Sequence, residues 1–291
     1  MNETLSLSAF WTLFAPSIAA ALVAAAVCGV LGFFVVLRRV AFVSAALGQI
    51  SGLGVATGFL LGTVFGLDPH EHTPVYLDPV MLAIVLSAGT SLLLASVSRV
   101  QRASPESTVA FAYITASALA IIVLASPKIV QESHEVTDLL FGSTVAVRRE
   151  HLVELGVVAA VVLASQFFLF KDFLFVSFDP EMARTLGLPV RRLDMVLNLS
   201  VGVAVTVATR AVGALPVFGF LVLPAGAALL AFQSVRVVLI VSVLGAMFAA
   251  GFGFYLSAAF DWPTGPMMVV VAAAYWPIAA LFRLAGGRQR A

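Results

Sequence analysis

Cysteine and charge are scarce in this sequence. Its 291 residues include one cysteine, Cys28, so a disulfide framework within the chain is excluded. Only 11% of the residues are charged, whereas an ordinary soluble domain has about a quarter. The net charge of +1 gives no basis for nucleic-acid binding. Glycine (22 residues) and proline (13) are too few for a collagen-like or low-complexity chain.

Apolar residues fill the chain instead. They make up 61% of it, and the mean hydropathy is +1.08. About 20 such residues cross a bilayer as a helix, and charged or Pro/Gly-bearing joints separate runs of that length. The sequence therefore predicts an all-α, polytopic integral membrane protein with eight or nine transmembrane helices in a single domain, 1–291. The expected spans are 10–37, 41–65, 79–97, 109–126, 152–170, 193–208, 212–232, 237–258 and 266–283.

The joint between the sixth and seventh expected spans is the weakest. Only Thr209 and Arg210 interrupt the apolar stretch there, which leaves open that one segment is a broken or re-entrant helix. The seventh span also contains Pro216 and Pro224, which remove helix hydrogen bonds. These prolines predict a kinked or interrupted helix that either borders a substrate path or is only a kink.

The Lys/Arg bias orients the chain. If the joint at Arg38 and Arg39 is cytoplasmic, twelve of the sixteen basic residues fall on that side and four on the other. The N-terminus is then outside and the C-terminus cytoplasmic. The second span carries Gly48, Gly52, Gly54, Gly58 and Gly62, small residues that predict close helix packing or, alternatively, a sliding pore wall.

The most unusual polar segment runs from Phe175 to Arg192. Asp179-Pro180-Glu181 is typical of a helix start, a short helix over 182–186 follows, and Gly187 is a plausible stop. A capped helix on the cytoplasmic face offers a docking surface for another protein, and a plain connecting loop is the alternative. The residues expected to carry the docking are Asp179, Pro180, Glu181, Ala183 and Gly187.

This segment resembles the cytoplasmic coupling region of permeases from the metal-type ABC importer family, which carry zinc, manganese or iron. Further stretches are similar to the same family in the same order: Gly32 to Phe59, ASPESTVAFAY (Ala103 to Tyr113), LLFGSTVAV (Leu139 to Val147), Val212 to Phe232 and DWPTGP (Asp261 to Pro266). The resemblance implies the ABC importer permease fold in the plasma (inner) membrane of a bacterium. It also implies a homodimer among membrane lipid, a separate ABC ATP-binding subunit on the short helix, and an extracytoplasmic substrate-binding protein.

The chain departs from that family in its second span. Members typically carry a Gly-Asp-x-x-x-His pattern whose Asp and His line the ion path, whereas residues 44–49 read SAALGQ, with Ser44, Ala45 and Gln49 at the matching positions. Alanine cannot coordinate a metal, and glutamine offers only a neutral carbonyl. The expected path residues are Ser44, Gln49, Pro216 and Pro224. Gln49 either lines a path for a neutral or chelated solute or is a helix-packing amide.

Two outer histidine groups are candidates for metal binding. His70 and His72 lie in a polar loop, and His134 precedes Glu135 and Asp138. The loop with His70 and His72 is alternatively a solvated entry surface. The His134 group shows no third ligand at fixed spacing and is alternatively a polar helix face touching the binding protein.

No catalytic constellation is visible, and no GxxxxGK[ST] phosphate loop occurs in the sequence. We therefore expect a transport subunit, not an enzyme, without a cofactor of its own. The predicted cargo is a metal ion or metal chelate. The alternatives are a non-metal small solute in the same architecture, or an ATP-independent channel or membrane scaffold.

Overall fold

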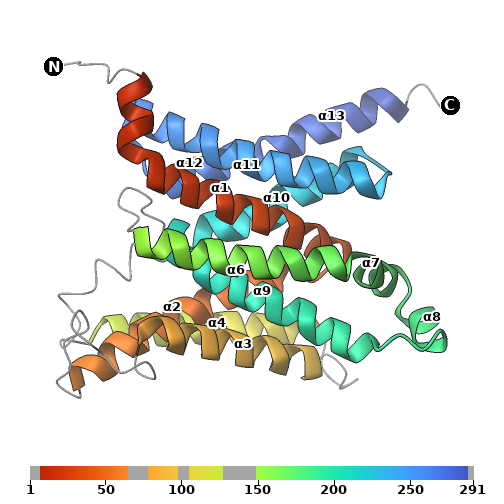
Figure 1. Cartoon of the computed structure of the whole chain (residues 1–291), viewed down its shortest axis with the longest axis horizontal. Coiled ribbons are helices and arrows are strands. Elements are labelled where there is room, and N and C mark those ends of the chain that lie inside the picture. The colour runs from red at the N-terminus through yellow and green to blue at the C-terminus, as the bar shows by residue number, and fades with distance from the viewer. Residues whose placement is uncertain (1–6, 65–77, 98–104, 127–148, 288–291) are drawn as a thin grey trace.

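The computed structural model describes residues 7–64, 78–97, 105–126 and 149–287, and all regular secondary structure in these ranges is helical (Figure 1). This confirms the all-α prediction. The helices are α1 (Leu7–Leu37), α2 (Ala41–Val64), α3 (Pro79–Val97), α4 (Pro105–Leu124), α6 (Arg149–Phe168), α7 (Phe170–Phe178), α8 (Pro180–Thr185), α9 (Val190–Val212), α10 (Ala214–Ala231), α11 (Val235–Phe260), α12 (Thr264–Ala273) and α13 (Tyr275–Gly287).

Within the described residues, eight helical segments are long and apolar enough to cross a membrane. They are α1, α2, α4, α6, α9, α10, α11 and the α12–α13 pair, which together cover Thr264–Leu284. The remaining expected span is α3, whose apolar part, Pro79–Leu94, is shorter. The structure therefore agrees with the prediction of eight or nine spans.

The break between the sixth and seventh spans lies at Gly213, not at Thr209 and Arg210. Gly213 has φ 96° and ψ 156°, ending α9 and preceding α10. A residue with a Cβ rarely adopts this conformation, so the chain can change direction there because it has glycine. Arg210 instead remains inside α9, which is consequently longer than the sequence predicted.

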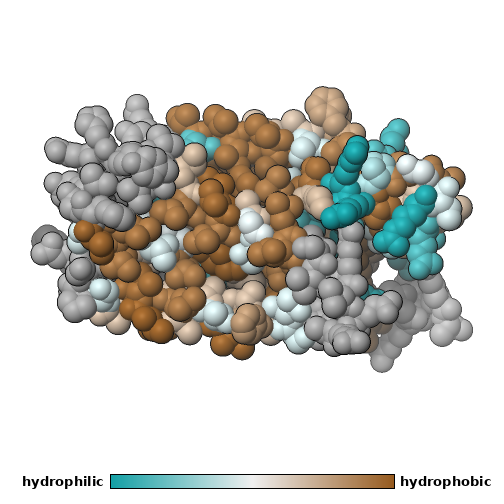
Figure 2. Space-filling model, turned by 90° about the horizontal axis from the view of Figure 1, so that it is seen from below, coloured by the Kyte–Doolittle hydropathy of each residue, from teal (hydrophilic) through white to brown (hydrophobic). Residues whose placement is uncertain are grey.

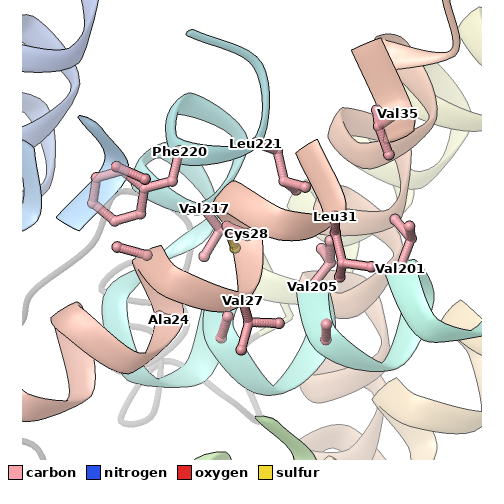
Figure 3. Packing of buried hydrophobic residues seen from close by; sticks show 14 of the residues in the cluster. Ala24, Val27, Cys28, Leu31, Val35, Val201, Val205, Val217, Phe220 and Leu221 are labelled. Atoms are coloured by element: carbon pink, nitrogen blue, oxygen red, sulfur yellow. The ribbon is translucent and has the colours of Figure 1, made fainter. Parts of the chain in front are cut away.

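The helices pack in two groups, and α9 contacts helices of both (Figure 1). Helix α1 contacts α6, α9, α10 and α11, while α2 packs on α3 and α4. Apolar side chains of α1, α9 and α10 meet in the core (Figure 3), among them Cys28, Leu31, Val201, Val205, Val217 and Leu221. The face drawn in Figure 2 is largely apolar, with hydrophilic residues gathered at the right-hand end, where Figure 1 shows α8.

Two glycines of α2 allow close helix packing, which is one of the two interpretations offered by the sequence. A Cβ built on Gly58 would lie 2.5 Å from Cα of Pro79, and one on Gly54 would collide with Ala83. Both neighbours belong to α3, so the two backbones touch because these glycines have no side chain.

Candidate functional site

The short helix α8 begins as the sequence predicted. Asp179 is its N-cap, and the Asp179 Oδ1 accepts a hydrogen bond from the Met182 backbone N–H at 2.8 Å. Pro180 occupies the first helical turn, where its missing N–H costs nothing. Glu181 follows in the same turn, near the positive end of the helix dipole.

The end of α8 is a Schellman motif. Gly187 has φ 81°, in the left-handed region. Its N–H donates to the Arg184 carbonyl at 3.0 Å, and the Leu188 N–H donates to the Ala183 carbonyl at 3.0 Å. These two bonds are the pair that defines the motif. A helix of only six residues thus has both ends fixed, which confirms the predicted stop at Gly187.

The two faces of α8 differ. Ala183 is fully buried in the main hydrophobic core, whereas Met182 is 54% exposed, Leu186 63% and Phe178, just before the helix, 61%. Large apolar side chains exposed beside charged Glu181 form a surface suited to a protein partner. Ala183 was expected to take part in docking, but the structure places it beneath the helix, where it seats α8 on the bundle.

Helix α7, which leads into α8, is fixed to the end of α1 by aromatic contacts. The Phe34 ring lies 5.7 Å from the ring of Phe170 and 5.8 Å from that of Phe173, both edge-on. Phe173 and Val176 are buried. The segment carrying α8 is therefore packed against α1 on one side, and α9 continues from it on the other.

Arg38 connects these parts by polar bonds. Its Nε donates to Ser177 Oγ at 2.8 Å, and its Nη1 donates to Asp194 Oδ1 at 2.7 Å. Burial lowers the pKa of the Arg38 guanidinium, and the Asp194 carboxylate acts in the opposite direction. Asp194 lies in the first turns of α9. Nothing local indicates its pairing with Arg38, because 156 positions separate them.

The expected path residues of α2 lie within the bundle. Ser44 is buried, and its hydroxyl donates to the Ala41 carbonyl of the same helix at 2.6 Å. Ala45 and Gln49 are both partly exposed. Gly48, between them, faces the start of α10, since a Cβ there would lie 3.6 Å from that of Ala214. This stretch therefore lies near the break at Gly213.

The two prolines of α10 are buried, and the helix that holds them is continuous. Pro216 is in the first turn, where proline disrupts least. Pro224 packs toward α11, its Cβ 3.4 Å from the Cβ position of Gly245. Of the predicted kink or interruption, the structure therefore shows no interruption at either proline, because α10 continues as one helix past both, and the break at Gly213 precedes them.

At the opposite end of the bundle from α8, His151 and Glu154 of α6 meet Arg210 of α9. The Glu154 Oε2 lies 3.2 Å from Arg210 Nη1 and 4.0 Å from His151 Nδ1. In the part of the chain that the structure describes, no three His, Cys, Asp or Glu residues gather to hold a metal ion. The metal candidates His70, His72, His134, Glu135 and Asp138 lie outside the described residues.

Comparisons with known proteins give a consistent match. The ABC 3 transport family matches residues 11–283. The chain is 27% identical over 267 residues to the manganese transport system membrane protein MntC of Halalkalibacterium halodurans, covering 91% of this chain and 86% of that protein. It is 26% identical over 266 residues to the chelated iron transport system membrane protein YfeD of Yersinia pestis, covering 91% and 84%.

The fold also matches a solved structure. PsaBC from Streptococcus pneumoniae, in complex with a Fab, contains a chain that superposes with a TM-score of 0.75 at 23% sequence identity. The match covers 91% of this chain and 90% of that one. The arrangement of helices described above is therefore shared over nearly the whole length.

Proposed function

The chain belongs to the ABC 3 transport family and is a membrane permease subunit, not itself catalytic, and we propose that it imports a metal ion or metal chelate. The cargo class rests on relatives named for manganese and for chelated iron. The observation that carries the mechanism is α8, a doubly capped helix with exposed apolar side chains between α7 and α9. ATP hydrolysis then belongs to a separate ABC ATP-binding subunit that docks on α8.

This assignment fixes an orientation and a set of partners. The α8 end faces the cytoplasm of a bacterium, together with the C-terminus, in agreement with the twelve-to-four distribution of basic residues. A substrate-binding protein delivers the cargo at the opposite end. Two copies of the chain form the complete pathway, through which alternating access moves the cargo.

Variants of α8 test the docking. Gly187→Pro forces φ from 81° to near −65° and so destroys the C-terminal cap. Glu181→Lys reverses an exposed charge without touching the core. In proteoliposomes holding the complete complex, we expect both variants to lose ATP-dependent uptake of Mn²⁺ and of a ferric chelate, while Glu181→Gln loses less. Parent-like uptake by both variants would show that the ATPase docks elsewhere.

A chelate is favoured over a free ion because of α2. Ala45 and Gln49 stand where the resembled family has Asp and His, and neither is a good ligand for a bare divalent cation in a membrane. A chelated cation brings its own ligands and requires fewer from the protein. This cargo choice concerns the path alone and is independent of the α8 docking.

Uptake assays with free Mn²⁺, Zn²⁺ and Fe²⁺ beside iron chelates separate the two cargoes. We expect the parent to prefer a chelate and the double variant Ala45→Asp with Gln49→His to gain free Mn²⁺ uptake. Thr57→Ala is the matched control, because Thr57 lies in the same helix outside the expected path and its hydroxyl is already bonded to the Gly54 carbonyl within α2. Equal free-ion uptake by the parent and the double variant would show that positions 45 and 49 of α2 do not determine the cargo.

A further inference from the structure

The helix α8 is attached to the bundle at two flanks, and one side chain from elsewhere in the chain holds both. Ser177 lies two residues before the N-cap Asp179, and Asp194 lies in the first turns of α9, after α8. Arg38 binds Ser177 through Nε at 2.8 Å and Asp194 through Nη1 at 2.7 Å. The Ser177 hydroxyl in turn donates to the Phe173 carbonyl, so this contact reaches the backbone of α7.

Arg38 belongs to the turn that joins α1 to α2. Only residues 38–40 separate the two helices. The turn is closed by the Arg39 N–H to the Val36 carbonyl and the Val40 N–H to the Val35 carbonyl, both at 3.0 Å, with Arg39 at φ 59°. This is a second Schellman motif. A displacement of Arg38 should therefore displace the start of α2, because the turn between them is short and held by hydrogen bonds.

The Arg38–Asp194 ion pair is largely buried, and a small cavity lies next to it. The Arg38 side chain is 14% exposed and that of Asp194 is 26% exposed, and separating a largely buried charge pair without replacement partners is costly. A small cavity lies beside it, lined by Arg38, Val43 and Leu197 among others. Val43 belongs to α2 and Leu197 to α9, so the two helices have unfilled space at the point where Arg38 connects them.

We propose that Arg38 is a positioning residue that transmits movement of the α8 flanks to α2, the helix that carries Ser44 and Gln49. By holding Ser177 and Asp194 together, it makes α7, α8 and the start of α9 move as one body with the α1–α2 turn. This inference rests on the proposed function, since it requires an ATPase that moves α8. It assigns to one side chain the coupling between the docking surface and the substrate path.

The test compares variants in proteoliposomes that contain the permease, its ATP-binding subunit and its binding protein. The readouts are assembly with the ATP-binding subunit, ATP hydrolysis, and uptake of Mn²⁺ and of a ferric chelate per ATP hydrolysed. Arg38→Gln should assemble and hydrolyse ATP as the parent does, while cargo moved per ATP falls on the order of tenfold. Ser177→Ala, which removes one of the two contacts and is sterically mild, should give a smaller fall.

Matched variants separate transmission from folding and from loss of charge. Arg39→Gln removes the same charge from the neighbouring, exposed position and should leave the ratio unchanged. The double variant Arg38→Asp with Asp194→Arg restores an attraction and should recover part of the ratio that Arg38→Gln loses. If Arg38→Gln and Ser177→Ala both move as much cargo per ATP as the parent, the proposal is overturned. It is also overturned if Arg38→Gln fails to assemble with the ATP-binding subunit. Both outcomes leave the importer assignment intact. A parent complex that neither assembles nor transports refutes the proposed function itself.

Discussion

At the scale of single residues, glycine sets how closely the spans approach. A Cβ on Gly32 of α1 would collide with the carbonyl oxygen of Leu221 in α10. At Gly253 of α11 the same addition would lie 2.5 Å from Cα of Met268 in α12. In lipid the hydrophobic effect does not drive helices together, so van der Waals contact between close backbones contributes much of the packing energy.

Gly32→Ala should therefore destabilise the bundle. The methyl group meets backbone, which cannot rotate away, and overpacking of this kind costs about 1–3 kcal/mol. The measurement is the free energy of unfolding in detergent, by titration with a denaturing detergent. Gly156→Ala is the control, because no atom beyond its own helical turn lies within 4 Å of its Cβ position in α6. The control should be neutral or stabilising by about 0.5–1 kcal/mol, and equal losses at both sites would contradict the packing argument.

At the scale of elements, what could be predicted depended on whether its cause was local. Asp179 and Pro180 stand at the start of α8, and Gly187 lies two residues after its end, so the sequence predicted both ends of the helix correctly. The ion pairs could not be predicted from the sequence, because their partners lie far apart along the chain; Glu154 and Arg210, for example, are 56 positions apart. The break at Gly213 was missed because a glycine permits an unusual φ without requiring it.

Removing the N-cap should loosen α8 without unfolding the bundle. Asp179→Ala deletes the acceptor of the Met182 N–H, a loss of about 1 kcal/mol, which corresponds to a roughly fivefold larger equilibrium constant for opening of the first turn. Amide hydrogen exchange at Met182 measures this directly. Asp179→Asn keeps a capping oxygen and should exchange nearly as slowly as the parent. The cap assignment fails if Asn and Ala exchange at the same rate.

Gly213→Ala tests whether the break between α9 and α10 depends on glycine. Its φ of 96° with ψ of 156° is a region that is essentially restricted to glycine, so a Cβ should cost about 1–3 kcal/mol of unfolding free energy. Gly89→Ala in α3, with open space around its Cβ position, is the matched substitution and should not show this cost. Unfolding free energies that shift alike for the two variants would mean that the break tolerates a side chain.

At the scale of the whole molecule, one helix defines the two sides of the membrane. Helix α11 has 26 residues, which at 1.5 Å each extends about 39 Å, enough for a hydrocarbon core of about 30 Å. Gln233 lies exposed in the turn before it, and Trp262 lies exposed in the turn after it. These two positions should face opposite compartments, with Gln233 on the cytoplasmic side together with the C-terminus.

The scarcity of cysteine makes this orientation measurable. Cys28, the single cysteine, is fully buried in the core, so a membrane-impermeant maleimide should leave the parent unlabelled. Trp262→Cys should react in intact cells, whereas Gln233→Cys should react only after the membrane is opened. Both substitutions replace exposed side chains, so neither disturbs the core that holds α11 in place. If Gln233→Cys reacted in intact cells and Trp262→Cys did not, α8 would face away from the cytoplasm, where ATP and any ATP-binding subunit are found, and the docking assignment would fail with the orientation.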